Sequence, residues 1–303
     1  MLATSQNLGC LLCGPDAAFR VKYAERLPAA GVDFAARRTP CRIHFRIVEC
    51  TGCGLTYSNP IYPPDEILQL YRAARYILEP QLDNMLKDYV RQFQQALPLA
   101  PSRRRLLEIG CASGFFLKAA RAAGFEEVVG VEPGRQAVEN AAADIRGAIV
   151  NDVFRGEQFE PESFDCVCLF QVLDHLLDPL DLVRNVFRVL RPGGVLLAVN
   201  HNIRSWFARA LGERCPMYDV EHIYLFNPAT ISGLLTRCGF QVKCARGIAT
   251  SYTCQYALKM FPLPSWLRAA AGGLISICGL NNRSVSFPGG NMVAVGMKPV
   301  IPG

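Results

Sequence analysis

The sequence predicts an α/β protein in which a doubly wound, mostly parallel sheet follows a small cysteine-bearing N-terminal segment. Between Arg105 and Asn200, short apolar runs alternate with segments of helical periodicity. This alternation is typical of a parallel sheet with helices on both faces. The first 60 residues differ, because they contain two Cys-x-x-Cys pairs and a strand-like alternation at Ile43, Phe45 and Ile47.

The composition excludes several classes of protein. Of the 303 residues, 50% are hydrophobic and 19% are charged, which excludes a disordered or collagen-like chain. No apolar run reaches the ~18 residues that a membrane span needs. Residues 1–9 have neither a basic region nor a long apolar stretch, so we expect no secretory signal. The 13 cysteines are then expected to be reduced thiols of a cytoplasmic protein, some of them metal ligands.

The charge is unevenly distributed, although the formal net charge is only +6. Residues 106–221 carry 11 basic and 17 acidic side chains, whereas residues 222–303 carry 7 basic and no acidic ones. A chain that binds nucleic acid through its backbone charge is usually more basic, with clustered cations. Nucleic acid is therefore an unlikely partner on this evidence.

Three parts are expected: a head at 1–60, a helical connector or cap at 61–102, and a main domain at 103–303. The sequence of the connector predicts two helices between Pro63 and Leu97. The first begins with prolines followed by acidic residues, which suit a helix N-terminus. Residues 98–102 read as a linker. Within the main domain, residues about 250–290 form a basic, apolar insertion.

The main domain predicts a regular series of elements. Strands are expected at Arg105–Gly110, Val128–Glu132, Phe164–Phe170, Val195–Val199, Phe240–Cys244 and Met292–Met297. Helices are expected at Ser113–Ala123 and Gly134–Ala143, from Pro179 through Leu190, and from Asn227-Pro228 onward. Glycines and prolines at the boundaries support these ends.

A small-residue loop lies where the first strand turns into a helix, in Leu-Leu-Glu-Ile-Gly-Cys-Ala-Ser-Gly-Phe-Phe-Leu at 106–117. Small residues at Gly110, Ala112 and Gly114 let a ligand approach the backbone, and the following helix N-terminus supplies free N–H donors. Glu132 ends the next strand, 22 residues after Gly110. A carboxylate at that place can accept both hydroxyls of a ribose.

Two cofactor classes use this geometry. A dinucleotide site wants Gly-x-Gly-x-x-Gly, which would put its third glycine at 115. The chain has Phe115 there, and a bulky ring obstructs close helix packing and pyrophosphate approach. A nicotinamide oxidoreductase is therefore the less favoured alternative.

The observed spacing, Glu-x-Gly-x-Ala-x-Gly, resembles the first motif of class I S-adenosylmethionine-dependent methyltransferases, with Ala112 in place of the middle glycine. Further stretches resemble later elements of that family: Asn151-Asp152-Val153, Phe164-Asp165-Cys166-Val167, 171–179, Leu190-Arg191-Pro192-Gly193-Gly194, 221–226 and 235–240. The resemblance covers roughly residues 104–242. It implies a seven-stranded, Rossmann-like sheet and an S-adenosylmethionine cofactor.

The resemblance also implies roles for the loop residues. The backbone at Gly110 and Gly114, with Ala112 between them, would face the methionine end of the cofactor. Glu108 would hold its ammonium group through water.

Three residues beyond the loop complete the implied site. Glu132 would bind the ribose and Asp152 the adenine amine, although Asp152 can equally be an ordinary loop carboxylate. Gln171, at the end of the fourth strand, would line the site near the transferable methyl group.

The methyl group on a sulfonium is already activated, so the protein must mainly align an acceptor and exclude water. A base is needed when the acceptor carries a proton of high pKa. His175 and His222 are the candidates, because histidine titrates near neutrality. For His175 a packing role is as plausible as a catalytic role. For His222 a packing role is somewhat favoured over a catalytic one. His44 and His201 have no convincing catalytic context.

The two cysteine pairs, Cys10/Cys13 and Cys50/Cys53, predict a zinc site in the head. Two Cys-x-x-Cys turns can bring four thiolates to one tetrahedral ion, and glycines lie beside them. Burial of reduced thiols in a small core is the alternative, and Cys41 and His44 are possible substitute ligands. The pattern resembles the zinc-ribbon-like head of some bacterial methyltransferases, and a small head would gain stability from metal.

The tail contains an apolar stretch, Trp266–Leu280, flanked by Lys259 and Arg283. It is too short to span a bilayer. It can lie on the inner face of an anionic membrane or cap a hydrophobic acceptor. A core helix packed over the sheet is the favoured alternative, because Gly272-Gly273 would weaken a free amphipathic helix.

The leading hypothesis is thus a methyltransferase acting on a small-molecule or a lipid- or sugar-linked acceptor. A zinc-headed binding module with a non-catalytic nucleotide fold is the second hypothesis, and the oxidoreductase is the third. The acidic middle of the chain disfavours the binding module.

Overall fold

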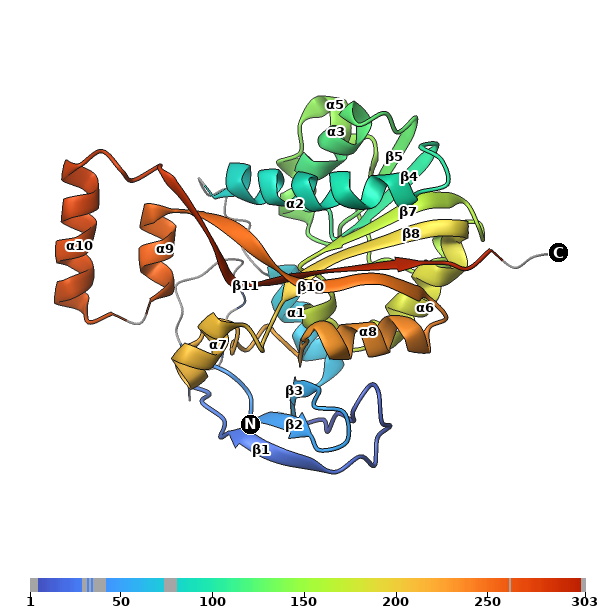
Figure 1. The fold of residues 1–303 in the computed structure, drawn as a ribbon. Coiled ribbons are helices and arrows are strands. Elements are labelled where there is room, and N and C mark those ends of the chain that lie inside the picture. The colour runs from blue at the N-terminus through green and yellow to red at the C-terminus, as the bar shows by residue number, and fades with distance from the viewer. Residues whose placement is uncertain are drawn as a thin grey trace.

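The computed structural model describes residues 5–28, 32, 34, 42–73, 81–261 and 263–300. A seven-stranded sheet forms its centre, in the order β10-β11-β8-β7-β4-β5-β6 (Figure 1). Its strands are β4 (Arg105–Ile109), β5 (Glu127–Val131), β6 (Ile149–Val150), β7 (Phe164–Phe170), β8 (Leu190–His201), β10 (Gln241–Thr253) and β11 (Ser284–Met297). This arrangement confirms the predicted Rossmann-like fold class.

Strand direction divides the sheet into two regions. Strands β6, β5, β4, β7 and β8 are parallel neighbours, whereas β11 is antiparallel to both β8 and β10. The central strands are buried on both faces, as the wholly buried β7 illustrates. Their carboxyl ends therefore meet at one edge of the sheet, where ligands of open α/β sheets bind.

Helices cover both faces (Figure 1). One face carries α2 (Leu82–Ala96), α3 (Phe115–Ala122) and α5 (Ala143–Arg146), and the other carries α1 (Pro64–Ala73), α6 (Pro179–Val189) and α8 (Pro228–Arg237). Helix α4 (Arg135–Glu139) lies between β5 and α5 along the chain. Local signals explain several helix starts. Asp178 accepts a hydrogen bond from the N–H of Asp181, and Asn227 caps α8 in a capping box.

Some predicted boundaries are wrong. The single helix expected at Gly134–Ala143 is two short helices, α4 and α5. The Asn140 amide donates to the carbonyl of Gln136, and the Arg146 guanidinium donates to the carbonyls of Glu139 and Ala141. These side chains satisfy carbonyls that a continuous helix would have used. The last two strands are longer than predicted, because they run beyond the sheet as a ribbon.

The N-terminal part forms a second, antiparallel sheet of β1 (Phe19–Tyr23), β2 (Ile47–Cys50), β3 (Thr56–Ser58) and β9 (Tyr224–Leu225). Strand β9 comes from the C-terminal half, so the head is tied to the main domain. Apolar side chains of both parts share one core, in which Phe45 and Tyr57 join Leu234. The division at residues 60 and 102 stays a prediction.

The segment expected as a core helix is exposed instead. Helices α9 (Cys254–Met260) and α10 (Ser265–Ile277) stand at the end of the β10–β11 ribbon, away from the sheet (Figure 1). No residue of either helix is buried. The prediction of a core helix at Trp266–Leu280 is therefore wrong, because the ribbon carries α10 beyond the sheet. Within the described ranges, no helix has the length and apolarity that crossing a membrane requires. The remaining helix, α7 (Trp206–Leu211), follows β8.

Candidate functional site

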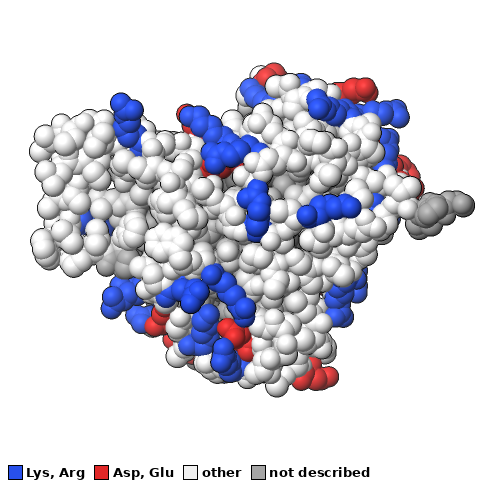
Figure 2. Space-filling model, in the orientation of Figure 1, with Lys and Arg blue, Asp and Glu red and all other residues white. Residues whose placement is uncertain are grey.

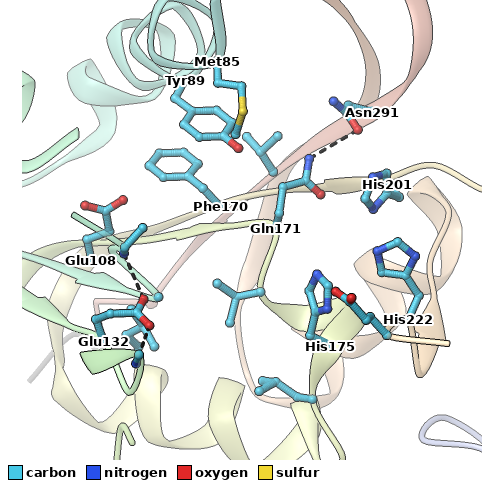
Figure 3. Close-up of a pocket in the computed structure, with 18 of the residues that line it drawn as sticks. Met85, Tyr89, Glu108, Glu132, Phe170, Gln171, His175, His201, His222 and Asn291 are labelled. Carbon is cyan, nitrogen blue, oxygen red and sulfur yellow. Dashed lines mark hydrogen bonds between the residues drawn. The ribbon is translucent and has the colours of Figure 1, made fainter. Parts of the chain in front are cut away.

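A cavity of about 950 Å³ opens at the carboxyl ends of the central strands. It is lined by the glycine loop after β4, by Glu132 after β5, by Gln171 after β7 and by His201 at the end of β8. Figure 3 shows Glu108 and Glu132 at one side of this cavity and three histidines at the other, with Gln171 between them. The volume is in the range of sites for small ligands and cofactors.

The glycine loop has an unusual backbone. Gly110, Ala112 and Gly114 all have positive φ angles, of 73°, 49° and 70°. This left-handed conformation costs glycine little and other residues more, which explains why small residues alternate here. Space is also tight, because a Cβ atom on Gly110 would lie 2.7 Å from a methyl group of Val172. Gly110 and Ala112 line the cavity, and Gly114 precedes α3.

Glu132 is fixed at the cavity wall by two backbone donors. Its Oε2 accepts from the N–H of Ala112 at 2.9 Å, and its Oε1 accepts from the N–H of Gly134 at 2.7 Å. Burial raises the pKa of this carboxyl, and the two N–H donors oppose that shift. Each oxygen keeps a further lone pair for a ligand hydroxyl.

Glu108 lies deeper, with only 1% of its surface exposed. Its Oε2 has no hydrogen-bond partner among the residues that the structure describes. Burial, followed by the charge of Glu132, raises the pKa of Glu108 well above its ordinary value. A buried carboxyl without a partner at a cavity wall can be stabilised by a cationic ligand group.

Gln171 has a strained backbone at the end of β7, with φ of 56°. Its N–H donor Nε2 lies 3.3 Å from Oδ1 of Asn291, whereas its buried Oε1 lacks a partner within the described chain. Strain of this kind gathers at functional sites. The side chain therefore presents a free acceptor at the middle of the cavity.

Asp152 does not line this cavity, although its neighbours Val153 and Phe154 do. Its carboxylate is partly exposed and pairs with Arg155. The N–H of Val153 also donates to it at 2.7 Å. The adenine contact of Asp152 stays a prediction, and it requires a side-chain movement.

Three imidazoles gather around one buried carboxylate at the opposite side of the cavity. Asp174, which is 0% exposed, accepts from Nδ1 of His201 at 2.6 Å and from the amide of Asn200 at 3.0 Å. The ring of His222 lies 4.7 Å from that of His201 and 4.8 Å from that of His175, between ring centroids. The structure therefore brings together the two predicted histidines and one that the sequence analysis discounted.

Hydrogen bonds define the proton positions on these rings. Nδ1 of His222 lies 2.9 Å from the carbonyl oxygen of Met217. A carbonyl only accepts, so Nδ1 carries the hydrogen and Nε2 of the neutral ring is a proton acceptor. The Tyr71 hydroxyl donates to the carbonyl of Glu221 at 3.0 Å, which leaves its oxygen to accept from Nδ1 of His175 at 3.0 Å.

The electrostatics follow from burial. Burial, with the positive charges of His201 and His175, lowers the pKa of His222 to about 4. Burial likewise lowers the pKa of His175. Burial opposes ionisation of Asp174, but the surrounding imidazoles hold its pKa well below its usual range. At neutral pH the cluster thus combines a carboxylate with the neutral imidazoles of His175 and His222, which can take up a proton.

His201 was not selected from the sequence, because only its position in the folded sheet indicates a role in the site. It is the last residue of β8, and its side chain reaches the site only because β8 ends at the same sheet edge as β7. One ligand atom each of Asp174, His175 and His222 lie within 4.8 Å of one another, as a metal site would need. Both oxygens of Asp174 already accept hydrogen bonds, however, so the arrangement favours proton transfer.

The four predicted cysteines converge in the head. The sulfur atoms of Cys10, Cys13, Cys50 and Cys53 all lie within 4.8 Å of one another. Tetrahedral zinc with bonds of about 2.3 Å separates its sulfur ligands by about 3.8 Å, so the cluster fits the ion. The two turns are equivalent, because Gly14 N donates to the Cys10 carbonyl and Gly54 N to the Cys50 carbonyl, each at 2.9 Å.

The four thiols differ in their pKa values. Burial raises the pKa of Cys10 and that of Cys53. At Cys50, burial also raises the pKa, but the N–H groups of Cys53 and Gly52, together with the neighbouring thiols, outweigh burial and lower that pKa to about 7. Of the substitute ligands, Cys41 lies outside the described residues. His44 is elsewhere, with Nδ1 2.7 Å from the carbonyl oxygen of Phe45 and Nε2 3.4 Å from Glu213.

Comparison with known proteins gives the family. Residues 81–245, more than half of the chain, match the family described as a methyltransferase domain. Among curated relatives, a ubiquinone biosynthesis O-methyltransferase of Proteus mirabilis is 26% identical over 36% of this chain and 47% of its own length. A tRNA U34 carboxymethyltransferase of Methylococcus capsulatus is 28% identical over 46% of this chain and 45% of its own length. The matches to these two relatives thus span about half of each relative.

A solved structure supports the fold. A chain of the complex between the Haloferax volcanii Trm112 methyltransferase activator and a methyltransferase superimposes with a TM-score of 0.50 and 18% identity. The match covers 72% of this chain and 93% of that chain. The match over residues 81–245 means that the chain belongs to the methyltransferase domain family, and the superposition supports the fold.

Proposed function

We propose that this enzyme transfers a methyl group from S-adenosylmethionine to a small-molecule or a lipid- or sugar-linked acceptor, which loses a proton to the histidine cluster. One observation carries the proposal: the glycine loop, Glu132 and the cluster around Asp174 line the same cavity. Membership of the methyltransferase domain family supports this activity over the oxidoreductase and the non-catalytic module. The cofactor supplies a methyl group that an aligned nucleophile can displace.

The residues at one side of the cavity fit the cofactor. Gly110, Ala112 and Gly114 give the methionine end close access to the backbone, and Glu108 holds the ammonium group through water with its unpartnered oxygen. Glu132 accepts the ribose hydroxyls.

The adenine and methyl ends of the cofactor use residues farther along the sheet edge. Asp152 contacts the adenine amine once it leaves Arg155. Gln171 faces the region of the methyl group with its free carbonyl oxygen and positions the acceptor there.

His222 is the proposed base, with His175 as its partner. The Met217 carbonyl orients the neutral His222 ring with Nε2 as acceptor, and burial keeps this ring unprotonated at neutral pH. When His222 takes the proton of the acceptor, the Asp174 carboxylate stabilises the charge that forms across the cluster. A buried, water-poor site strengthens this stabilisation.

The head is proposed to bind one zinc ion through Cys10, Cys13, Cys50 and Cys53, in a structural or acceptor-positioning role. The equivalent turns and the thiolate-favouring backbone donors support this assignment. The earlier expectation that nucleic acid is an unlikely partner lacks support, because one relative is named for a tRNA substrate. A tRNA acceptor is therefore the second candidate.

The deciding experiment supplies the full chain with isotope-labelled S-adenosylmethionine and three separate acceptor pools: small molecules, lipids and tRNA. Mass detection of the labelled product identifies both the pool and the methylated atom. Label in the lipid or small-molecule pool, lost in His222→Asn, supports the proposal. Label in tRNA alone would replace the acceptor class, and no label in any pool would contradict the proposed transfer.

A further inference from the structure

The hairpin lobe, defined as residues 254–283 with α9 and α10, is joined to the sheet by the paired ends of β10 and β11. The outer ends of β10 and β11 pair in continuous register from Thr250 opposite Phe287 to Thr253 opposite Ser284. The N–H of Cys254 donates to the carbonyl of Arg283 at 2.9 Å and closes the base of the lobe. The buried Asp88 of α2 accepts from the N–H of Ser251 at 2.6 Å. The lobe therefore has a defined position.

Helix α10 presents an apolar stripe to solvent. Trp266, Leu274 and Ile277 are 71%, 64% and 85% exposed, and Ala270 lies between them in the sequence. The spacing of four, four and three residues puts these side chains on one face of the helix. The opposite face meets α9, where a Cβ atom on Gly272 would lie 3.7 Å from Leu258. A row of large exposed apolar side chains indicates an interaction surface.

The charge of the lobe has one sign. Its charged residues are Lys259, Arg268 and Arg283, with no Asp or Glu. Figure 2 shows the lobe as mostly uncharged surface with Lys and Arg but without acidic side chains. Arg268 is partly engaged, because its guanidinium lies 3.3 Å from the carbonyl oxygens of Phe261 and Leu263. A lobe that carries an apolar stripe and only positive charge is complementary to an anionic lipid surface.

The lobe also borders the cavity. Tyr256 and Met260 of α9 line it, together with Tyr252 and Phe287 of the ribbon. The rings of Tyr252 and Tyr256 stack with centroids 5.8 Å apart. Aromatic and apolar side chains of the lobe and its ribbon thus form part of the cavity wall. Such a wall suits a hydrophobic acceptor.

We propose that the hairpin lobe rests on an anionic lipid bilayer and that the methyl acceptor is a hydrophobic molecule dissolved in that bilayer. The claim about the methyl acceptor rests on the proposed function, whereas the claim that the lobe docks on a bilayer does not. Helix α10 is about 20 Å long, which is too short to cross a bilayer but suits a position in the interface. Trp266, Leu274 and Ile277 enter the boundary between headgroups and acyl chains. Lys259 and Arg283 meet the lipid phosphates.

Two other occupants fit the lobe less well. A second copy, placed symmetrically, would bring two sets of cations together without any acid on either lobe. Nucleic acid would meet the cations but would leave the apolar stripe in water. A bilayer satisfies both features.

The test uses the full chain and vesicle flotation at low and high salt, with phosphatidylglycerol or phosphatidylcholine vesicles. The parent is expected to float with the anionic vesicles and to be released by salt. The double variant Leu274→Asn/Ile277→Asn is expected to partition at least tenfold less. Leu99→Asn, which changes an exposed leucine far from the lobe, is the matched control and should float like the parent.

Cofactor affinity, measured separately, shows whether each variant is folded. Failure of the parent to float, or equal flotation of the double variant, would overturn the docking proposal. A smaller sedimenting mass of the double variant without vesicles would assign the stripe to a second copy, and would also overturn it. A parent protein that floats with the vesicles but does not bind the cofactor would contradict the proposed function and leave the docking proposal in place. Labelled product confined to water-soluble acceptors would overturn the bilayer-acceptor part.

Discussion

Nδ1 of His201 lies 2.6 Å from Oδ2 of the buried Asp174, and this contact organises the acceptor side of the cavity. A carboxylate with no solvent exposure needs positive or donating partners, and Asn200 and His201 supply them. The ring of His201 in turn lies 4.7 Å from that of His222, tilted by 56°, and helps to lower the pKa of His222. The proposed base therefore works inside an electrostatic network that joins β7, β8 and the loop before β9.

Replacing His222 by Asn should lower the methyl-transfer rate by about 100-fold or more, because a positioned base contributes about that much. The cofactor affinity should stay unchanged, since His222 lies away from the glycine loop. Single-turnover rates with the acceptor identified above, together with calorimetry of cofactor binding, measure both effects. His44→Asn is the control, because that histidine is buried outside the cavity. An unchanged rate in His222→Asn would remove it as the base.

Replacing Glu132 by Ala should weaken S-adenosylmethionine binding by about 1–3 kcal/mol, because the ribose loses a charged acceptor. Glu127→Ala is the matched control: Glu127 begins the same strand but pairs with Arg105, outside the cavity. Calorimetric titration of parent and variants provides the comparison. Equal affinities of the parent and Glu132→Ala would contradict the ribose contact.

Cofactor binding should release a proton from Glu108. Burial raises the pKa of Glu108 in the free enzyme, so this carboxyl binds a proton above its ordinary pKa. A bound ammonium favours the carboxylate and lowers that pKa, so the proton leaves. Affinity should therefore rise with pH above the ordinary pKa of a glutamate, about 4.3, as long as the amino group of the cofactor stays cationic.

Titrations in buffers of different ionisation enthalpy count the released protons. Glu108→Gln should abolish both the release and the rise in affinity. The opposite slope, or the same slope in Glu108→Gln, would assign the linkage to another group.

Protein purified without chelator should contain one zinc ion per chain. Cys10→Ser and Cys50→Ser should each lose the metal and destabilise the protein by about 4 kcal/mol or more, because a metal-held core opens without its ion. Cys278→Ser, at an exposed cysteine far from the cluster, should keep both metal and stability. Metal analysis and thermal unfolding test this. Metal-free parent protein, as stable as its cysteine variants, would leave the cysteines as packed thiols.

Much of the cofactor side could be predicted from the sequence, because its determinants are local. A strand, a small-residue turn and a helix follow one another within residues 105–122, and the left-handed φ angles at Gly110 and Gly114 favour glycine at those positions. The alternation of strands and helices likewise determined the sheet, since apolar periodicity reports which face of each element is buried.

The acceptor side and the hairpin lobe depended on tertiary structure. Asp174, His201 and His222 come from separate segments and meet only because parallel strands end at one edge and the loop before β9 folds back over it. The apolar segment at 265–277 could equally have been a core helix, since composition alone does not state which surface covers it. The long pairing of β10 with β11 decided this, because it carries α10 beyond the sheet and leaves its apolar stripe in solvent.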